Sequence, residues 1–293
     1  MTADPSPKSD PSLEAEPRRG RVRRWLVRAT LALGLVVGVG GLFEVTIWTA
    51  PAHMVFNALP ALDEREAWQA EEPTLVVLQH GLASSPWTLW RLERTLEANG
   101  YAVLNPSYPS LDGGLEDFAA SLHEKIERAC AERAASGEPA FERFCFVGHS
   151  MGGLVIRSYL AREDSREAHR SVFLGTPHRG SAMAKAWIDR WWFQLLLSGK
   201  GATRQLVPGD PIYDRLRGVD AGQVGTLVGS VDTDGAEVIP GPDDGRIGVD
   251  EGQLPAAADS AVLPMGHFSL SFDRRMIEPV MRFLRSGRFD GQG

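Results

Sequence analysis

Cysteine is scarce in this sequence: only Cys130 and Cys145 occur among its 293 residues. Neither belongs to a CxxC pair, and no pair of histidines lies near them at the spacing of a zinc site, so a zinc module of the usual kind is excluded. In an oxidising compartment the two thiols are able to form one disulfide. We expect two separate thiols, with a disulfide as the alternative, because sequence spacing does not give the distance between the two Cα atoms.

The sequence also lacks an excess of positive charge, since its formal net charge is −7. Its one dense basic run, residues 18–24, lies ahead of the region that we expect to fold. Proteins that bind nucleic acid more often carry a basic stripe through their folded part, so we expect no nucleic-acid partner. The content of 43% hydrophobic and 24% charged residues is ordinary for a globular protein.

Long apolar runs are rare, and the longest lies near the N-terminus. Residues 1–24 are polar and then basic, and they predict a disordered tail. Residues 25–50 contain an uninterrupted apolar or small stretch at 29–43 and predict a transmembrane signal anchor. The positive-inside rule places the tail in the cytoplasm and the remaining chain on the other side of the membrane. A cleaved signal peptide, which would release a secreted protein, and a buried helix are the alternatives.

After a linker at residues 51–72, short apolar runs alternate with helical patterns as far as residue 288. This alternation predicts an α/β fold with a mostly parallel sheet and helices on both faces. The carboxyl ends of such strands carry the active site. An insert at about 180–219 interrupts the pattern. The expected strands are residues 74–79, 101–105, 144–148, 171–175, 224–231 and 259–263, and the main helices are 87–99, 115–135, 152–162 and 274–286.

The segment Gly148-His149-Ser150-Met151-Gly152 has the Gly-x-Ser-x-Gly spacing of a nucleophile elbow. In that turn a serine lies between a strand and a helix, and the flanking glycines let the backbone close without Cβ clashes. The five-residue pattern alone is weak because the chain has 31 glycines. Its context is stronger, since an apolar strand pattern precedes it and an apolar helix pattern follows. We therefore predict that Ser150 is a nucleophile.

A serine nucleophile needs backbone donors for the oxyanion that forms when it attacks a carbonyl. His80-Gly81-Leu82 follows the first predicted strand, where the loop of such a fold offers one N–H group, and the residue after the nucleophile offers the other. We predict that the N–H groups of Leu82 and Met151 form this oxyanion hole. His80 is expected to hold the loop rather than to touch substrate.

The general base is expected to be a histidine after the last strand. His267 lies just beyond the predicted strand 259–263 and before the final helix. The other histidines fit less well: His149 adjoins the nucleophile and its side chain is expected to point elsewhere. His178 follows a middle strand, and His123 falls within a helix.

The acid that orients the base is expected after the fifth strand, where several aspartates are crowded together. Asp244 stands directly before Gly245 and is favoured, with Asp243 and Asp232 as alternatives. A calcium site in this loop is conceivable, but the EF-hand pattern is missing, and we expect no metal. The order Ser150, Asp244, His267 is the chain order that this kind of site requires.

Together these segments resemble the bacterial lipase/esterase branch of the α/β-hydrolases. The resemblance rests on His80-Gly81-Leu82, the elbow with Gly153, Asp244-Gly245, Gly266-His267 and the segment Gly-Thr-Pro-His-Arg-Gly-Ser at 175–181, and it covers about residues 73–286. It implies hydrolysis of carboxylic esters, often with acyl chains, without a cofactor. For a bacterial protein, the anchor predicted at residues 25–50 would lie in the inner membrane, with the catalytic part on the periplasmic or extracellular side.

The insert at about 180–219 matches no pattern, but it is rich in large apolar side chains. Trp187, Trp191 and Trp192 fall in a stretch that also contains phenylalanine, isoleucine and three leucines. We predict either a lid or acyl-chain pocket formed by these residues, or a helix packed on the sheet. Because the apolar side chains surround the helix, a surface position would require cover by lipid or substrate.

The same three catalytic residues serve several reactions, so alternatives to an esterase or lipase stay open. An acyltransferase, a thioesterase and an amidase use the same Ser-His-Asp chemistry. A non-catalytic membrane-bound binding protein with a hydrolase fold is a further alternative. The complete predicted triad argues against it, because proteins that have lost catalysis usually lack one member.

Overall fold

The computed structural model describes residues 65–191, 193–194, 201–216, 218, 223–231 and 238–289. The chain divides into two units, Met1–Pro60 and Ala61–Gly293, and every described residue belongs to the second. The predicted tail and anchor, residues 1–24 and 25–50, lie outside the described residues, as does most of the linker. No helix in the described ranges has both the length and the apolar character to span a bilayer. The membrane anchor therefore has no structural support and stays a prediction.

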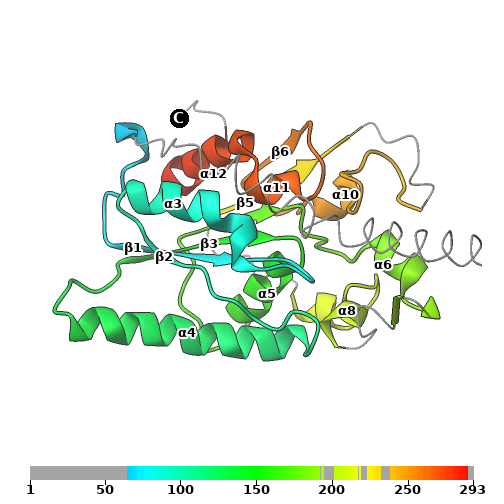
Figure 1. Ribbon diagram of the computed structural model, residues 1–293, viewed down its shortest axis with the longest axis horizontal. Helices are drawn as coiled ribbons and strands as arrows, with labels where there is room; N and C mark the ends of the chain where they lie inside the picture. The colour runs from blue at the N-terminus through cyan, green and yellow to red at the C-terminus, as the bar shows by residue number, and fades with distance from the viewer. Residues whose placement is uncertain are drawn as a thin grey trace, which may run out of the picture. The chain divides into compact units, whose positions relative to one another are not determined.

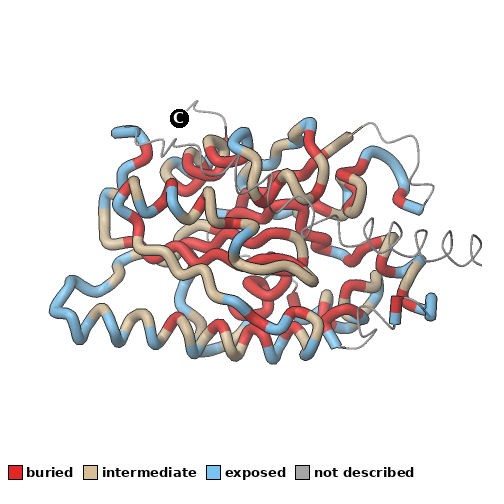
Figure 2. Tube along the Cα trace, in the orientation of Figure 1, coloured by how far each residue is buried: buried red, intermediate tan, exposed pale blue. Residues whose placement is uncertain are grey.

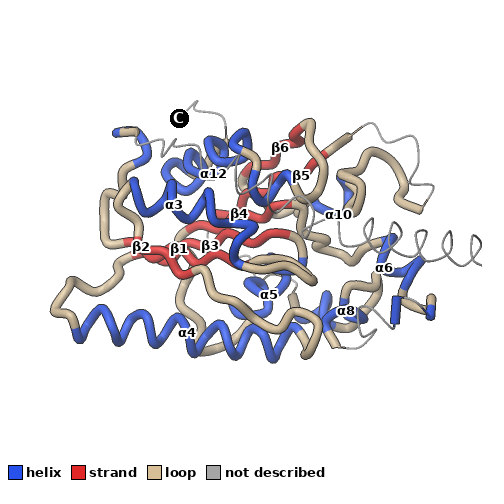
Figure 3. Tube along the Cα trace, in the orientation of Figure 1, coloured by secondary structure: helices blue, strands red, loops and turns tan. Residues whose placement is uncertain are grey.

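The described part of the chain forms one six-stranded sheet, whose strands are coloured red in Figure 3. Every neighbouring pair of strands in it is parallel. The strand order is β2-β1-β3-β4-β5-β6. β1, β3, β4 and β5 are mostly buried because helices cover both faces, as continuous apolar runs predict. The strands are β1 (Thr74–Gln79), β2 (Ala102–Leu104), β3 (Arg143–His149), β4 (Arg170–Leu174), β5 (Gln223–Gly229) and β6 (Asp259–Leu263).

Two layers of helices enclose this sheet, as Figure 1 shows. One face carries α3 (Trp90–Ala98), α11 (Ser269–Phe272) and α12 (Arg274–Ser286), and the other carries α4 (Leu115–Ala135) and α5 (Met151–Leu160). Strand residues alternate between two apolar cores: Val77 and Phe146 pack toward α4 and α5, whereas Val76 and Val147 pack toward α3 and α12. Buried positions therefore line both sides of the sheet in Figure 2. The predicted α/β fold is confirmed.

The two cysteines lie on opposite sides of the sheet. Cys130 on α4 packs against the core on that side, and Cys145 in β3 belongs to the core beneath α12. Both thiols are free. The disulfide alternative is therefore wrong, because the sheet separates the two side chains.

Of the smaller elements, the first precedes β1, and the others lie in the connections that follow β1, β4 and β5. The first predicted helix, 87–99, begins instead as a 3-10 turn that starts with proline and becomes α-helical at Trp90. The described part of the insert contains only short helices. These smaller elements are η1 (Glu66–Trp68), η2 (Pro86–Leu89), α6 (Ala182–Trp187), α8 (Ala202–Gln205), α9 (Ile212–Arg215) and α10 (Val249–Gly252).

Candidate active site

Ser150 lies between the end of β3 and the start of α5 in a strained conformation. Its φ of 55° and ψ of −129° fall in a region that side chains with a Cβ rarely adopt. Its N–H donates to the Leu174 carbonyl at 2.8 Å, which fixes the turn against the neighbouring strand. A Cβ on Gly148 would lie 2.5 Å from Gly153 Cα, and one on Gly152 would lie 2.1 Å from the Gln79 carbonyl oxygen. Both glycines are thus required by close backbone approach.

Asp244 and His267 form a buried pair at the same edge of the sheet. His267 Nδ1 donates to Asp244 Oδ2 at 2.8 Å, and the side chains are 7% and 0% exposed, respectively. Asp244 Oδ1 accepts from the N–H groups of Arg246 at 2.9 Å and Ile247 at 2.7 Å. Because a carboxylate accepts, Nδ1 carries the proton and Nε2 is left as the basic nitrogen. This tautomer is the one that a general base for a serine hydroxyl requires.

Of the other candidate acids, Asp243 makes no hydrogen bond or ion pair with His267 in the part of the chain that the structure describes. Asp243 Oδ1 accepts from the Gly245 N–H at 2.6 Å and so stabilises the turn next to Asp244. Asp232 lies outside the described residues. In the described ranges no three His, Cys, Asp or Glu side chains gather as metal ligands would, so the calcium alternative has no support.

The loops after β1 and β4 bring Ser150 close to the Asp244–His267 pair. A Cβ on Gly81 would lie 3.0 Å from Ser150 Cβ, and one on Gly175 would lie 3.1 Å from both Asp244 Oδ2 and His267 Nδ1. No hydrogen bond between Ser150 Oγ and His267 is present in the part of the chain that the structure describes. Such bonds commonly tighten only in the substrate complex. The three predicted catalytic residues therefore share one edge, and their roles stay predictions.

The predicted oxyanion donors occupy the first turn of α5 and the loop after β1. Met151 is the first residue of α5, where helix geometry leaves a backbone N–H without an intrahelical acceptor. Leu82 follows Gly81, which lies directly against Ser150. His80 holds this loop: its Nδ1 donates to the Gly81 carbonyl at 3.0 Å, and its ring stacks on Tyr108. Burial lowers the pKa of His80 to about 4, so its ring is neutral at neutral pH.

The Gly-Thr-Pro-His segment packs behind the candidate triad, a role that its pattern did not reveal. Gly175 has a φ of 54° and lies against the Asp244–His267 hydrogen bond. The Thr176 side chain fills the space that a Cβ on Gly153 would take, at 2.1 Å. The His178 N–H donates to the Glu251 carbonyl at 2.9 Å, which ties this segment to the acid loop. Only the resemblance pointed to these residues, because their partners lie far away in the sequence.

His149 differs from the expectation that its side chain points away from the site. Its ring lies 4.8 Å from the His267 ring, centroid to centroid, and its Nε2 is 2.9 Å from the His267 carbonyl oxygen. The alternation of a strand predicts only that neighbouring side chains point to opposite faces. It does not predict which loop covers the side chain at the end of the strand.

The tryptophans of the insert have different surroundings. Trp187 is half-buried and its ring meets that of Phe193 edge-on at 6.3 Å, whereas Trp191 is 70% exposed. Trp192 lies outside the described residues. The lid or acyl-chain pocket therefore stays a prediction.

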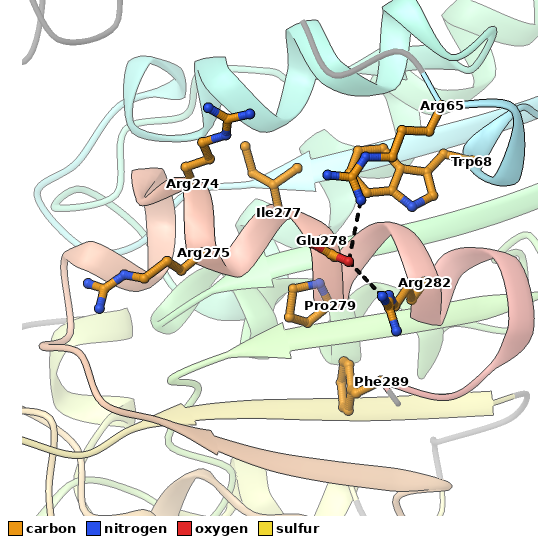
Figure 4. Close-up of a pocket in the computed structure, with 9 residues that line it drawn as sticks. All are labelled: Arg65, Trp68, Arg274, Arg275, Ile277, Glu278, Pro279, Arg282 and Phe289. Carbon is orange, nitrogen blue, oxygen red and sulfur yellow. Dashed lines mark hydrogen bonds and ion pairs between the residues drawn. The ribbon is translucent and has the colours of Figure 1, made fainter. Parts of the chain in front are cut away.

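A cavity of ≈ 490 Å³ lies between η1 and α12 and contains none of the predicted site residues. Figure 4 shows that Glu278 lies between Arg65 and Arg282, and it pairs with them at 3.4 and 2.6 Å. The Arg65–Glu278 pair connects the start of the described chain to α12, whereas the Glu278–Arg282 pair lies within that helix. A structural role accounts for this cluster, because its acid is already bound by two guanidinium groups.

Gly175 provides a direct test of the packing around the candidate acid and base. Gly175→Ala is expected to lower the free energy of unfolding by about 1–2 kcal/mol, because alanine is strained at a positive φ. The added methyl group is also expected to displace the Asp244–His267 pair and so to lower kcat/KM by about tenfold or more. Gly137→Ala is the matched control, since Gly137 has a φ of 76° with nothing within 4 Å of an added Cβ. Thermal melts and ester hydrolysis measure both effects. Full activity in Gly175→Ala would contradict this account.

Comparisons with known proteins agree with this architecture. A model of the alpha/beta hydrolase family matches residues 75–280. A lipase from Bacillus licheniformis in its mature form is 21% identical with a TM-score of 0.54, and the match covers 78% of this chain and 96% of that one. For a metagenomic carboxyl esterase the identity is 15%, the TM-score 0.51 and the coverage 75% and 76%. At these identities the likeness shows the fold alone. No curated protein sequence matches the chain.

Proposed function

Because the chain belongs to the alpha/beta hydrolase family, we propose that it is a serine hydrolase that cleaves carboxylic esters through Ser150, His267 and Asp244. The observation that carries the proposal is the buried hydrogen bond between His267 and Asp244 beside the strained turn at Ser150. A lipase and a carboxyl esterase among the solved structures with this fold favour an ester as the substrate.

In the proposed mechanism, His267 Nε2 takes the proton of the Ser150 hydroxyl as Oγ attacks the ester carbonyl. The N–H groups of Leu82 and Met151 bind the oxyanion of the tetrahedral intermediate. When the intermediate collapses, the alkoxide leaves with the proton from His267, and an acyl-enzyme remains. His267 then activates a water molecule, which releases the carboxylic acid and restores Ser150. Asp244 keeps the imidazole in the required tautomer and stabilises its positive charge.

We infer that the substrate carries an apolar acyl chain. Trp87 and Trp191 are 66% and 70% exposed, and they lie in segments that follow the carboxyl ends of β1 and β4. Large exposed aromatic side chains at this edge fit contact with lipid-like material. The predicted anchor at residues 25–50 would hold the enzyme at a membrane with its catalytic part outside the cytoplasm, and release after signal cleavage is the alternative. Both locations rest on the sequence alone.

A series of p-nitrophenyl esters from acetate to palmitate tests the proposed substrate class. Each buried CH₂ contributes about 0.8 kcal/mol, so kcat/KM is expected to rise about fourfold per carbon until the site is filled. A matching thioester and anilide separate the thioesterase and amidase alternatives, and an added alcohol detects acyl transfer. If acetate is the best substrate, the acyl-chain proposal fails. Faster cleavage of the anilide would instead favour an amidase.

A further inference from the structure

His149 connects two loops of the proposed active site through one buried ring. It is the last residue of β3, directly before Ser150, and only 3% of it is exposed. Its Nε2 lies 2.9 Å from the main-chain carbonyl oxygen of His267. Because a carbonyl only accepts, Nε2 carries the proton and donates it. The ring also lies against the His267 ring, with centroids 4.8 Å apart and planes at 43°.

The opposite edge of the His149 ring faces the loop that is predicted to bind the oxyanion. A Cβ on Gly81 would lie 3.5 Å from His149 Nδ1 and 3.0 Å from Ser150 Cβ. Nδ1 has no hydrogen-bond partner in the described part of the chain. Hence only one ring nitrogen, Nε2, makes a hydrogen bond, and it makes that bond to the segment that carries the proposed base.

We propose that His149 is a positioning residue: it holds the His267 backbone, so that the imidazole of His267 stays aimed at Ser150. This inference rests on the proposed function. Burial and the neighbouring His267 lower the pKa of His149 to about 3, so its ring stays neutral at neutral pH. A neutral ring is suited to this place, because His267 itself becomes positively charged during each acyl transfer.

Three substitutions at position 149 separate a positioning role from simple packing. His149→Gln places an amide N–H where Nε2 lies, so the bond to the His267 carbonyl is kept. His149→Asn places its amide where Nδ1 lies, a position that has no hydrogen-bond partner in the described part of the chain. His149→Phe fills the space without a donor. Leaving the buried His267 carbonyl without its donor is expected to lower kcat about tenfold to a hundredfold in the Asn and Phe variants. The Gln variant is expected to recover to within about threefold of wild type.

The kinetics are measured on the full chain and normalised by titrating Ser150 with a fluorophosphonate, which removes effects of misfolding. KM is expected to change less than about twofold. Equal kcat in the Gln and Asn variants, or wild-type kcat in the Phe variant, would overturn the proposal. The downfield proton resonance of His267 Nδ1–H provides a readout without substrate: it should shift in the Asn and Phe variants and persist in the Gln variant. If the resonance is unchanged in all three variants, the positioning role of His149 is rejected. If the resonance changes as expected but the wild-type protein hydrolyses no ester, only the proposed function is rejected.

Discussion

Replacing Ser150 with alanine is expected to lower ester hydrolysis by about 10⁴-fold or more, because the proposed nucleophile is removed while the rest of the site is kept. The Ser150 hydroxyl makes no hydrogen bond in the described part of the chain, and the fold around it depends on its backbone N–H, which donates to the Leu174 carbonyl. Alanine retains that bond and the Cβ. The folded state is therefore expected to survive, with a change in unfolding free energy of less than about 1 kcal/mol.

Two comparisons sharpen the Ser150 test. Ser150→Gly removes the Cβ that conflicts with a φ of 55°, so it should be equally inactive but about 1 kcal/mol more stable than Ser150→Ala. Ser136→Ala, at an exposed position after α4, should keep full activity. Thermal unfolding, ester turnover and fluorophosphonate labelling give the three readouts. Hydrolysis or labelling at the wild-type level in Ser150→Ala would rule out Ser150 as the nucleophile.

The sequence predicted most of the strands and helices, because the patterns that define them lie within each segment. β1, α4, β6 and α12 have the predicted bounds, since apolar periodicity and the glycines at 137 and 287 define them locally. The helix predicted at 87–99 differs at its start, where Pro86–Leu89 forms a 3-10 turn and only Trp90–Ala98 is α-helical. The two cysteines show a limit of the same signals, because spacing along the chain does not indicate the face of the sheet on which each side chain lies.

The candidate site was only partly predictable for a related reason. Ser150, Asp244 and His267 each follow a strand, and parallel strands end at one edge, so topology alone predicts that they meet. Contacts between loops have no such periodicity. The contacts of Gly175 with the Asp244–His267 bond and of His149 with His267 bring together four segments, at the ends of β3, β4, β5 and β6. No sequence pattern in one of these segments indicates its partner in another.

Asp244→Asn is expected to lower kcat by about 10³- to 10⁴-fold, although it changes a single atom. The N–H groups of Arg246 and Ile247 both donate to Asp244 Oδ1, so the new amide must keep its oxygen there. Its NH₂ group then faces His267 Nδ1, which accepts only if the proton moves to Nε2. In that tautomer His267 is unable to take the Ser150 proton. The loss should appear in kcat rather than in KM, because the amide has the shape of the carboxylate.

Asp243→Asn is the matched control, since Asp243 is the neighbouring buried aspartate and uses one oxygen to accept the Gly245 N–H. An asparagine keeps that acceptor, so activity should stay within about threefold of wild type. Steady-state kinetics of the two variants on one ester decide between the adjacent acids. If Asp243→Asn were the inactive variant, Asp243 would have to be the acid. The two backbone N–H groups that donate to Asp244 would then serve only to stabilise the turn of the loop. Of the two adjacent acids the structure favours Asp244, because Asp244 Oδ2 accepts from His267 while its Oδ1 is held by two backbone N–H groups.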